Sequence, residues 1–239
     1  MDKELYIFFS TPDKTPDGTM AFRCVEKLIE TGIIKKENWS CVTGNTRSLA
    51  AVYNEVLKKP EVSGKILVYI HSDLIIDDIF VKEKLNERFS RCPKAVAVGI
   101  AGGGRMEYKP EIPQLWHLIT LRATRMGEVG GNLTNDILSP VMTTSFGLSG
   151  KRAILIDGCF MAIDVDRLKN VGVVFDENSP SLYNFYDLIF SVNCYLKGAE
   201  IYVDSIRATH KSPGLLKRNE DFNVGNEYFK KNFLSKIWK

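Results

Sequence analysis

Short apolar runs and stretches of helical periodicity alternate through the first hundred residues. Leu5–Phe9 and Ile66–Ile70 are continuous apolar runs, and Ala95–Ile100 is a third. Such runs are typical of strands that are buried on both faces. Between them, apolar residues recur every three or four positions across 20–30 and 49–57, which predicts helices with one buried face. Strands that alternate with amphipathic helices predict βαβ units, and hence a mostly parallel sheet flanked by helices.

This regular pattern is lost after Gly104. Residues 105–151 contain prolines and glycines without a sustained period, and so long a stretch without clear elements is usually functional or mobile. Order returns at Ala153–Ile163, followed by a predicted turn, a helical stripe at 188–196 and a last strand at Glu200–Val203. No linker composition separates these parts, so we expect one domain followed by a tail.

Polar residues follow the predicted strands at the point where each strand ends. In open parallel sheets, ligands bind beyond the carboxyl ends of the strands. The polar motifs of the first half all fall there, which predicts one site large enough for a nucleotide. They are Ser10–Thr11, Thr43–Ser48, His71–Asp73 and Gly102–Gly104.

The triplet His71-Ser72-Asp73 places a carboxylate just beyond a buried strand. Hard divalent cations bind carboxylate oxygens and keep positions open for phosphate oxygens, so Asp73 is a candidate cation ligand. The alternative is a loop Asp that caps a helix. His210 lies just past the last strand and is one of three histidines in the chain. For the third, His117, we expect a packing role.

The composition narrows the class of protein. The chain is 44% hydrophobic and 26% charged, which is typical of a globular protein. Its net charge of +3 is too small to indicate nucleic-acid binding. No apolar run approaches the ~20 residues that span a bilayer, and no signal-peptide core is present at the N-terminus, so we expect a cytoplasmic protein. The five cysteines form no C-x-x-C pair, which fits a reducing compartment.

A series of short motifs runs through residues 4–214 in a fixed order. They are SLAAVYNE (48–55), ILVYIHSD (66–73), VAVGIAG (96–102), DGCFMAI (157–163), FDE (175–177), YNFYDLIFSVNCYLKG (183–198) and ATHKSPG (208–214). In this order they resemble the family-two-type glycosyltransferases, and within them the group with His-x-Asp in place of Asp-x-Asp. Each motif alone is weakly specific, but chance does not readily produce the whole series.

The resemblance implies an A-type glycosyltransferase fold, with a Rossmann-like central sheet, and a nucleoside diphosphate sugar as donor, with a UDP-sugar favoured. It implies a Mn²⁺ or Mg²⁺ ion bound by Asp73 and His210, which would neutralise the leaving diphosphate. Asp187 matches the carboxylate of the family's Glu-Asp motif and is thereby implied as the general base of an inverting transfer to an acceptor hydroxyl. Tyr186 stands where relatives have Glu.

Further candidates follow from the same resemblance. Asp157 and Tyr186 are predicted to contact the acceptor or the transferred sugar, and the rings of Phe185 and Tyr186 to stack on the acceptor. Structural alternatives remain open, namely a plain loop at 10–11, helix capping at 45–47 and a buried structural carboxylate at 157. The donor-binding candidates are Ser10, Thr11, Asn45, Arg47, His71, Ser72 and Gly102.

The predicted domain is 1–214, with a nucleotide-binding half at 1–104 and an acceptor or catalytic half at 105–214. The tail at 215–239 mixes aromatic residues with lysines. It is either a helix packed on the domain or an element that contacts anionic lipid at the inner face of a membrane, in keeping with a glycan or lipid-linked acceptor. Two other functions stay open, a catalytically silent nucleotide- or glycan-binding relative and a nucleotidyltransferase. The loop STPDKTPDGT lacks the Gly-rich basic signature usual in the latter.

Overall fold

The computed structural model describes residues 2–103, 132–135, 142–145, 150–211 and 219–237. Within these residues, seven strands form a central sheet in the order β2-β1-β3-β11-β5-β12-β9. β11 and β9 run antiparallel to their neighbours, and the other strands are parallel to one another. The strands are β1 (Leu5–Ser10), β2 (Trp39–Val42), β3 (Ile66–His71), β5 (Ala95–Gly99), β9 (Lys151–Ala153), β11 (Phe160–Asp164) and β12 (Glu200–Val203).

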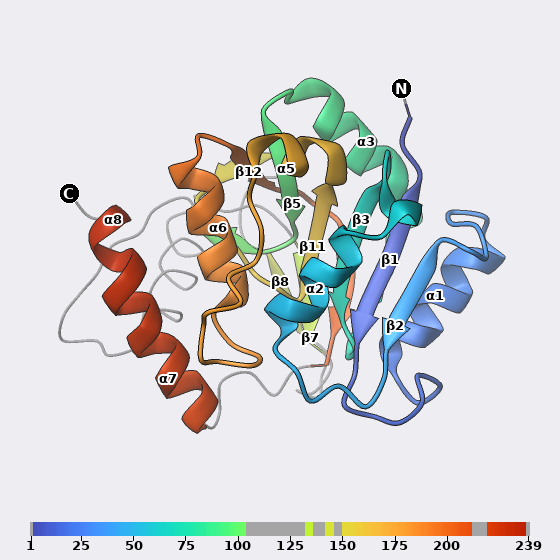
Figure 1. Cartoon of the computed structure of the whole chain (residues 1–239). Helices are drawn as coiled ribbons and strands as arrows, with labels where there is room; N and C mark the ends of the chain where they lie inside the picture. The colour runs from blue at the N-terminus through green and yellow to red at the C-terminus, as the bar shows by residue number, and fades with distance from the viewer. Residues whose placement is uncertain (1, 104–131, 136–141, 146–149, 212–218, 238–239) are drawn as a thin grey trace.

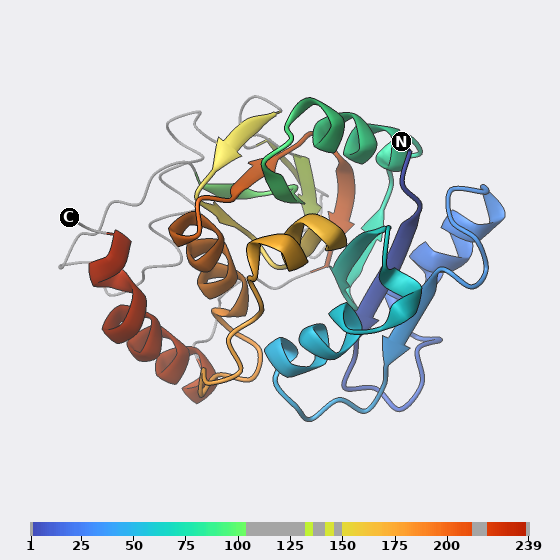
Figure 2. The same ribbon diagram turned by 45° about the horizontal axis from the view of Figure 1, so that its top comes forward.

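Helices cover both faces of this sheet (Figures 1 and 2). α1 (Met20–Glu30) and α3 (Val81–Arg91) pack on one face, and α2 (Leu49–Leu57), α5 (Val165–Val171) and α6 (Tyr186–Leu196) pack on the other. The strands are therefore buried on both sides, which explains their continuous apolar runs. The mostly parallel sheet flanked by helices, as predicted, is confirmed.

The two faces of β1 show how one apolar run supplies both layers of the core. Successive side chains of a strand point to opposite faces. Leu5, Ile7 and Phe9 belong to the cluster under α1 and α3, whereas Tyr6 and Phe8 belong to the cluster under α2 and α6. All five are at most 2% exposed.

Strand register aligns the predicted polar motifs at one edge of the sheet, at the lower side of Figure 1. Ser10 at the end of β1 lies opposite His71 at the end of β3. β11 enters between β3 and β5 and runs the other way, with Phe160 opposite Ile70. The His71 N–H donates to the Cys159 carbonyl at 3.0 Å. The turn that precedes β11 therefore meets the carboxyl end of β3.

A smaller sheet brings the last predicted histidine to the same edge. Within it, β13 pairs with β4, with His210 opposite Leu74, and the Lys211 N–H donates to the Asp73 carbonyl at 2.8 Å. This pairing sets His210 beside Asp73. The strands of this sheet are β4 (Leu74–Ile76), β13 (Arg207–His210), β7 (Asn132–Asn135) and β8 (Met142–Ser145).

Local details differ from the sequence prediction in both halves of the chain. The turn expected after Ile163 is helix α5, which Asp164 caps through its side chain and Gly172 ends at φ 70°. The sequence analysis missed this helix because it spans only two turns. It also missed β4 and β13, whose short runs lack a full period. Most of 105–151, including His117, lies outside the described residues.

The C-terminal segment packs on the domain through its aromatic residues. It consists of α7 (Glu220–Phe229), a π-helical turn at Lys230–Leu234 and α8 (Ser235–Ile237). Phe222, Phe229 and Phe233 are at most 5% exposed and share a cluster with residues of α6. The packed helix is therefore what the structure shows, and contact with anionic lipid stays a prediction. In the described part of the chain, none of the helices combines the length and apolarity that crossing a bilayer requires.

Candidate active site

Three predicted side chains converge at the carboxyl edge of the sheet. His71 ends β3, Asp73 follows it, and His210 ends β13. Nε2 of His210 lies 3.1 Å from Oδ1 of Asp73, and Nδ1 of His71 lies 4.0 Å from the same oxygen. One ligand atom from each residue lies within 4.8 Å of the others. Two imidazole nitrogens and a carboxylate oxygen at this spacing are able to hold a divalent cation.

The protonation states of the cluster suit that role. Burial and the neighbouring His210 lower the pKa of His71, so its ring is neutral at pH 7. Nε2 of His71 lies 2.8 Å from the Tyr186 hydroxyl oxygen. A proton on Nε2 leaves the Nδ1 lone pair directed to the cluster. Burial raises the pKa of Asp73, but the hydrogen bond with His210 and the two imidazoles outweigh it and hold the pKa below its usual value.

A pocket of about 280 Å³ opens beside the cluster. Its lining contains the predicted donor-binding residues Ser10, Thr11, Asn45, His71 and Ser72, together with Asp73. Oγ of Ser10 is buried and has no hydrogen-bond partner within the described residues. A buried hydroxyl without a partner is unfavourable, so a ligand that bonds it in the pocket would remove that cost.

Two predicted donor contacts lie elsewhere. Arg47 is exposed and forms an ion pair with Glu55, and it does not line the pocket. Gly102 is buried in the short strand β6 (Gly102–Gly103), where a Cβ would collide with the carbonyl oxygen of Leu155. Its lack of a side chain therefore serves close strand packing. Asn45 does line the pocket, although its side chain also holds the backbone of Arg47.

A second acidic site surrounds the start of α6. Oδ2 of Asp187 accepts the Gly158 N–H at 2.8 Å, and Oδ1 accepts the Leu188 N–H at 2.9 Å. Asp187 is 7% exposed. Burial, together with the nearby negative charge of Asp157, raises the pKa of Asp187 to about 7. A carboxyl group with this pKa exchanges a proton readily near neutral pH.

Tyr186 joins the two sites. Its hydroxyl reaches His71, its ring packs edge-on against Tyr53 at 5.4 Å between centroids, and Asp187 follows it in the chain. Gly158 permits this approach, since a Cβ there would collide with the hydroxyl. Phe185 and Tyr186 are only 4% and 5% exposed. Both rings pack in the core of this structure, and their stacking on an acceptor sugar stays a prediction.

Sequence reasoning missed the aromatic wall of the pocket. Tyr183 lines it, is 43% exposed, and donates from its hydroxyl to the Asn45 carbonyl at 3.2 Å. Phe185 adopts a left-handed conformation with φ 65°, a strained backbone of the kind found at functional sites. The aromatic residues of YNFYD were visible in the sequence, but no periodicity tells which of them face outward.

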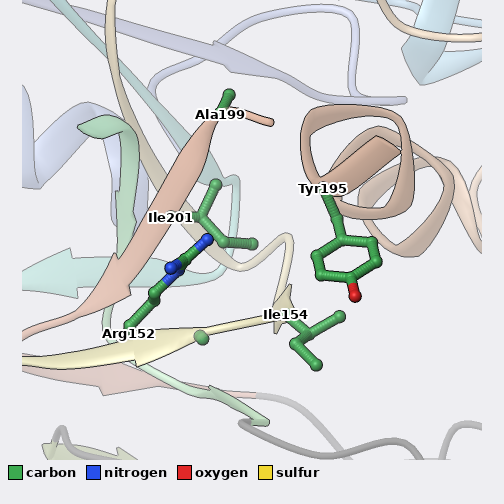
Figure 3. Close-up of a pocket in the computed structure, with 6 residues that line it drawn as sticks. Arg152, Ile154, Tyr195, Ala199 and Ile201 are labelled. Carbon is green, nitrogen blue, oxygen red and sulfur yellow. The ribbon is translucent and has the colours of Figure 1, made fainter. Parts of the chain in front are cut away.

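Another hollow, of about 400 Å³, lies away from both acidic sites. Figure 3 shows Tyr195 extending from α6 toward Ile154, with Arg152 on the edge strand and Ile201 on β12. Tyr195 is eight residues beyond Asp187, about 12 Å along the helix. This hollow contains none of the predicted site residues.

Two solved structures resemble the chain over nearly all of its length. GalNAc-T7 with UDP, GalNAc and Mn²⁺ matches with a TM-score of 0.53 and 10% identity, covering 98% of this chain and 48% of that one. The chain therefore spans about half the length of GalNAc-T7. TarS 1-349 of S. aureus in complex with UDP matches with a TM-score of 0.45 and 12% identity, covering 99% and 75%. The GalNAc-T7 match supports the fold. No curated protein matches the sequence.

A family model described as "Glycosyltransferase like family" matches residues 25–235. The match includes the cluster of His71, Asp73 and His210, the acidic site at Asp187 and most of the C-terminal segment. It includes the pocket lining from Asn45 onward but not Ser10 and Thr11. Together with the mixed sheet and the shared fold, it confirms the A-type glycosyltransferase fold predicted from the sequence motifs. The chain belongs to the glycosyltransferase-like family.

Proposed function

We propose that this chain transfers a sugar from a nucleoside diphosphate sugar, with a UDP-sugar favoured, to a hydroxyl of a glycan or lipid-linked acceptor. The observation that carries the proposal is the convergence of His71, Asp73 and His210 beside a pocket whose lining includes Ser10. We place the nucleoside of the donor in this pocket of about 280 Å³, with its diphosphate toward the cluster. The GalNAc-T7 structure, which has the same fold, contains UDP and Mn²⁺.

The residues present suit a divalent cation. Asp73 supplies an anionic oxygen, and the two histidines supply nitrogens within 4.8 Å. Mg²⁺ takes oxygen ligands in strict octahedral geometry. Because two of the three ligand atoms here are imidazole nitrogens, the cluster favours Mn²⁺ over Mg²⁺. When bound, the cation would neutralise charge on the leaving diphosphate. The hydrogen bond between His71 and Tyr186 would orient the His71 ring toward it.

On the acceptor side, Asp187 is the proposed base. Each of its oxygens accepts one backbone N–H and keeps a second lone pair for the acceptor hydroxyl. Removal of that proton activates the oxygen for attack on the anomeric carbon. Such a single displacement inverts the anomeric configuration and needs no protein nucleophile. Asp157 would assist by keeping Asp187 basic.

The proposed donor and acceptor sites are supplied mainly by different halves of the domain. In this proposal residues 1–104 supply all of the pocket lining except Tyr183, and residues 105–214 supply the base and contact the acceptor. Asp157 bridges the two parts, since its N–H donates to the Ala101 carbonyl at 2.9 Å. Its side chain accepts the Cys159 N–H at 2.9 Å, which fixes the turn between the pocket and the base.

The test is a panel of nucleoside diphosphate sugars with Mn²⁺, followed by product analysis. We expect release of a nucleoside diphosphate, dependence on the cation, and NMR evidence of inversion at the anomeric carbon. Release of pyrophosphate would identify a nucleotidyltransferase instead. Tight nucleotide binding without turnover on any acceptor would identify a binding module. Retention of configuration would rule out the single displacement.

A further inference from the structure

The loop before α6 is held from two sides by distant parts of the chain. It lies between the starts of α2 and α7 (Figures 1 and 2). On the α2 side, the Leu49 N–H donates to the Leu182 carbonyl at 2.8 Å, and the Tyr183 hydroxyl donates to the Asn45 carbonyl at 3.2 Å. On the α7 side, the loop is bound by one carboxylate, that of Asp221.

Asp221 accepts hydrogen bonds from four consecutive residues of this loop. Its Oδ1 accepts the Leu182 N–H at 2.6 Å. Its Oδ2 accepts the Ser181 hydroxyl at 2.8 Å, the Tyr183 N–H at 3.2 Å and the Asn184 amide at 2.5 Å. Burial raises the pKa of Asp221, but these hydrogen bonds outweigh it and lower the pKa below its usual value. The group is therefore an anion at neutral pH, with every partner a donor.

The position of this loop matters because Tyr183 lines the nucleotide pocket. Tyr183 is 43% exposed, and Ser10 and Thr11 belong to the same lining. A planar aromatic group on a pocket wall offers a stacking surface for a nucleoside. The main chain of Tyr183 is fixed by Asp221 and its hydroxyl by Asn45, so the ring is held at both ends.

We propose that Asp221 is a positioning residue of the donor site, which holds Tyr183 where its ring contacts the nucleoside of the donor. The inference rests on the proposed nucleotide-sugar donor and adds the C-terminal helix to the elements that bind it. Asp221 touches no substrate itself. Its effect on affinity passes through Tyr183.

A double-mutant cycle measured by calorimetry tests this proposal, with UDP and Mn²⁺ as the probe. We expect Asp221→Ala and Tyr183→Ala each to weaken UDP binding by roughly tenfold, the scale of one lost aromatic contact to a base. The double variant should bind about as weakly as Tyr183→Ala alone, because residues that act through one another are not additive. Glu220→Ala is the matched control, since this neighbour is exposed and makes no side-chain hydrogen bond within the described residues; it should keep wild-type affinity.

The outcomes separate this inference from the proposed function. If wild-type protein does not bind UDP with Mn²⁺, the donor assignment fails and the inference fails with it. If wild-type protein binds and either single variant binds equally well, the inference alone is overturned. Additive losses would show that Asp221 acts through general stability, which thermal unfolding of the same variants would register. Should Asp221→Ala fail to fold, Asp221→Asn carries the same cycle, because its amide nitrogen cannot accept the loop's donors.

Discussion

Asp73 and Asp187 are the same side chain in two opposite environments. Asp73 is partly exposed and faces two imidazoles, which hold its pKa below the usual value. Asp187 is buried beside Asp157, and its pKa is raised to about 7. A carboxylate that stays ionised is suited to bind a cation, whereas one that titrates near neutrality is suited to move a proton. The two environments therefore support the two roles proposed for these carboxylates.

The sharpest test of this comparison removes the titrating group. General-base assistance contributes roughly 10²–10⁴-fold, so Asp187→Asn should lower kcat by at least two orders of magnitude while the Kd for UDP stays nearly unchanged. Steady-state kinetics and calorimetry measure the two quantities. Asp157→Asn is the comparison variant, and a larger loss of kcat there than in Asp187→Asn would move the base to Asp157.

The reciprocal variant removes the cation ligand. Asp73→Ala removes the one carboxylate of the cluster, so UDP affinity in the presence of Mn²⁺ should fall more than about tenfold, with little change in the EDTA-treated sample. Calorimetry of both samples measures the difference. Glu83→Ala, an exposed carboxylate on α3, is the control. Equal affinity of wild-type protein with EDTA and with Mn²⁺ would contradict the role of Asp73.

The raised pKa of Asp187 predicts a pH profile. The base must be ionised, so kcat should rise about tenfold per pH unit below pH 7 and level off above it. The same shift acts on stability. The folded state binds the proton more tightly than the unfolded state between about pH 4 and pH 7, so wild-type protein should lose stability across that range as pH rises. Thermal unfolding should show no such loss for Asp187→Asn. A profile with no break near pH 7 would contradict the assignment.

The smallest expected effect concerns the pocket wall. Ser10→Ala removes a hydroxyl that has no protein partner within the described residues, so thermal stability should not fall. If a donor group bonds this hydroxyl, UDP affinity should drop by the ~0.5–1.5 kcal/mol of one hydrogen bond. Ser40→Ala, a serine on the neighbouring strand outside the pocket lining, should leave affinity unchanged.

The sequence predicted β1, β3, β5, α1 and α2 nearly residue by residue, because buried parallel strands and amphipathic helices have clear periods. It also predicted that His71, Asp73 and His210 belong to one site at the carboxyl edge of the sheet. What it could not supply is which candidate faces the pocket. Arg47 forms an ion pair with Glu55 and does not line the pocket. Tyr186 is buried in the core, whereas Tyr183, three residues earlier, lines the pocket. These outcomes depend on loop geometry set by distant hydrogen bonds, which have no local signal.

The position of β11 in the central sheet affects how the chain folds during its synthesis. This strand comes from the second half, yet pairs with β3 on one side and β5 on the other. Until residues 160–164 leave the ribosome, both strands carry open backbone edges of the kind that recruit other chains. The candidate active site is therefore completed late, through contacts between residues far apart in the chain, which slow folding. A nascent chain that stalls before residue 160 would be prone to aggregate and would lack Asp187 and His210.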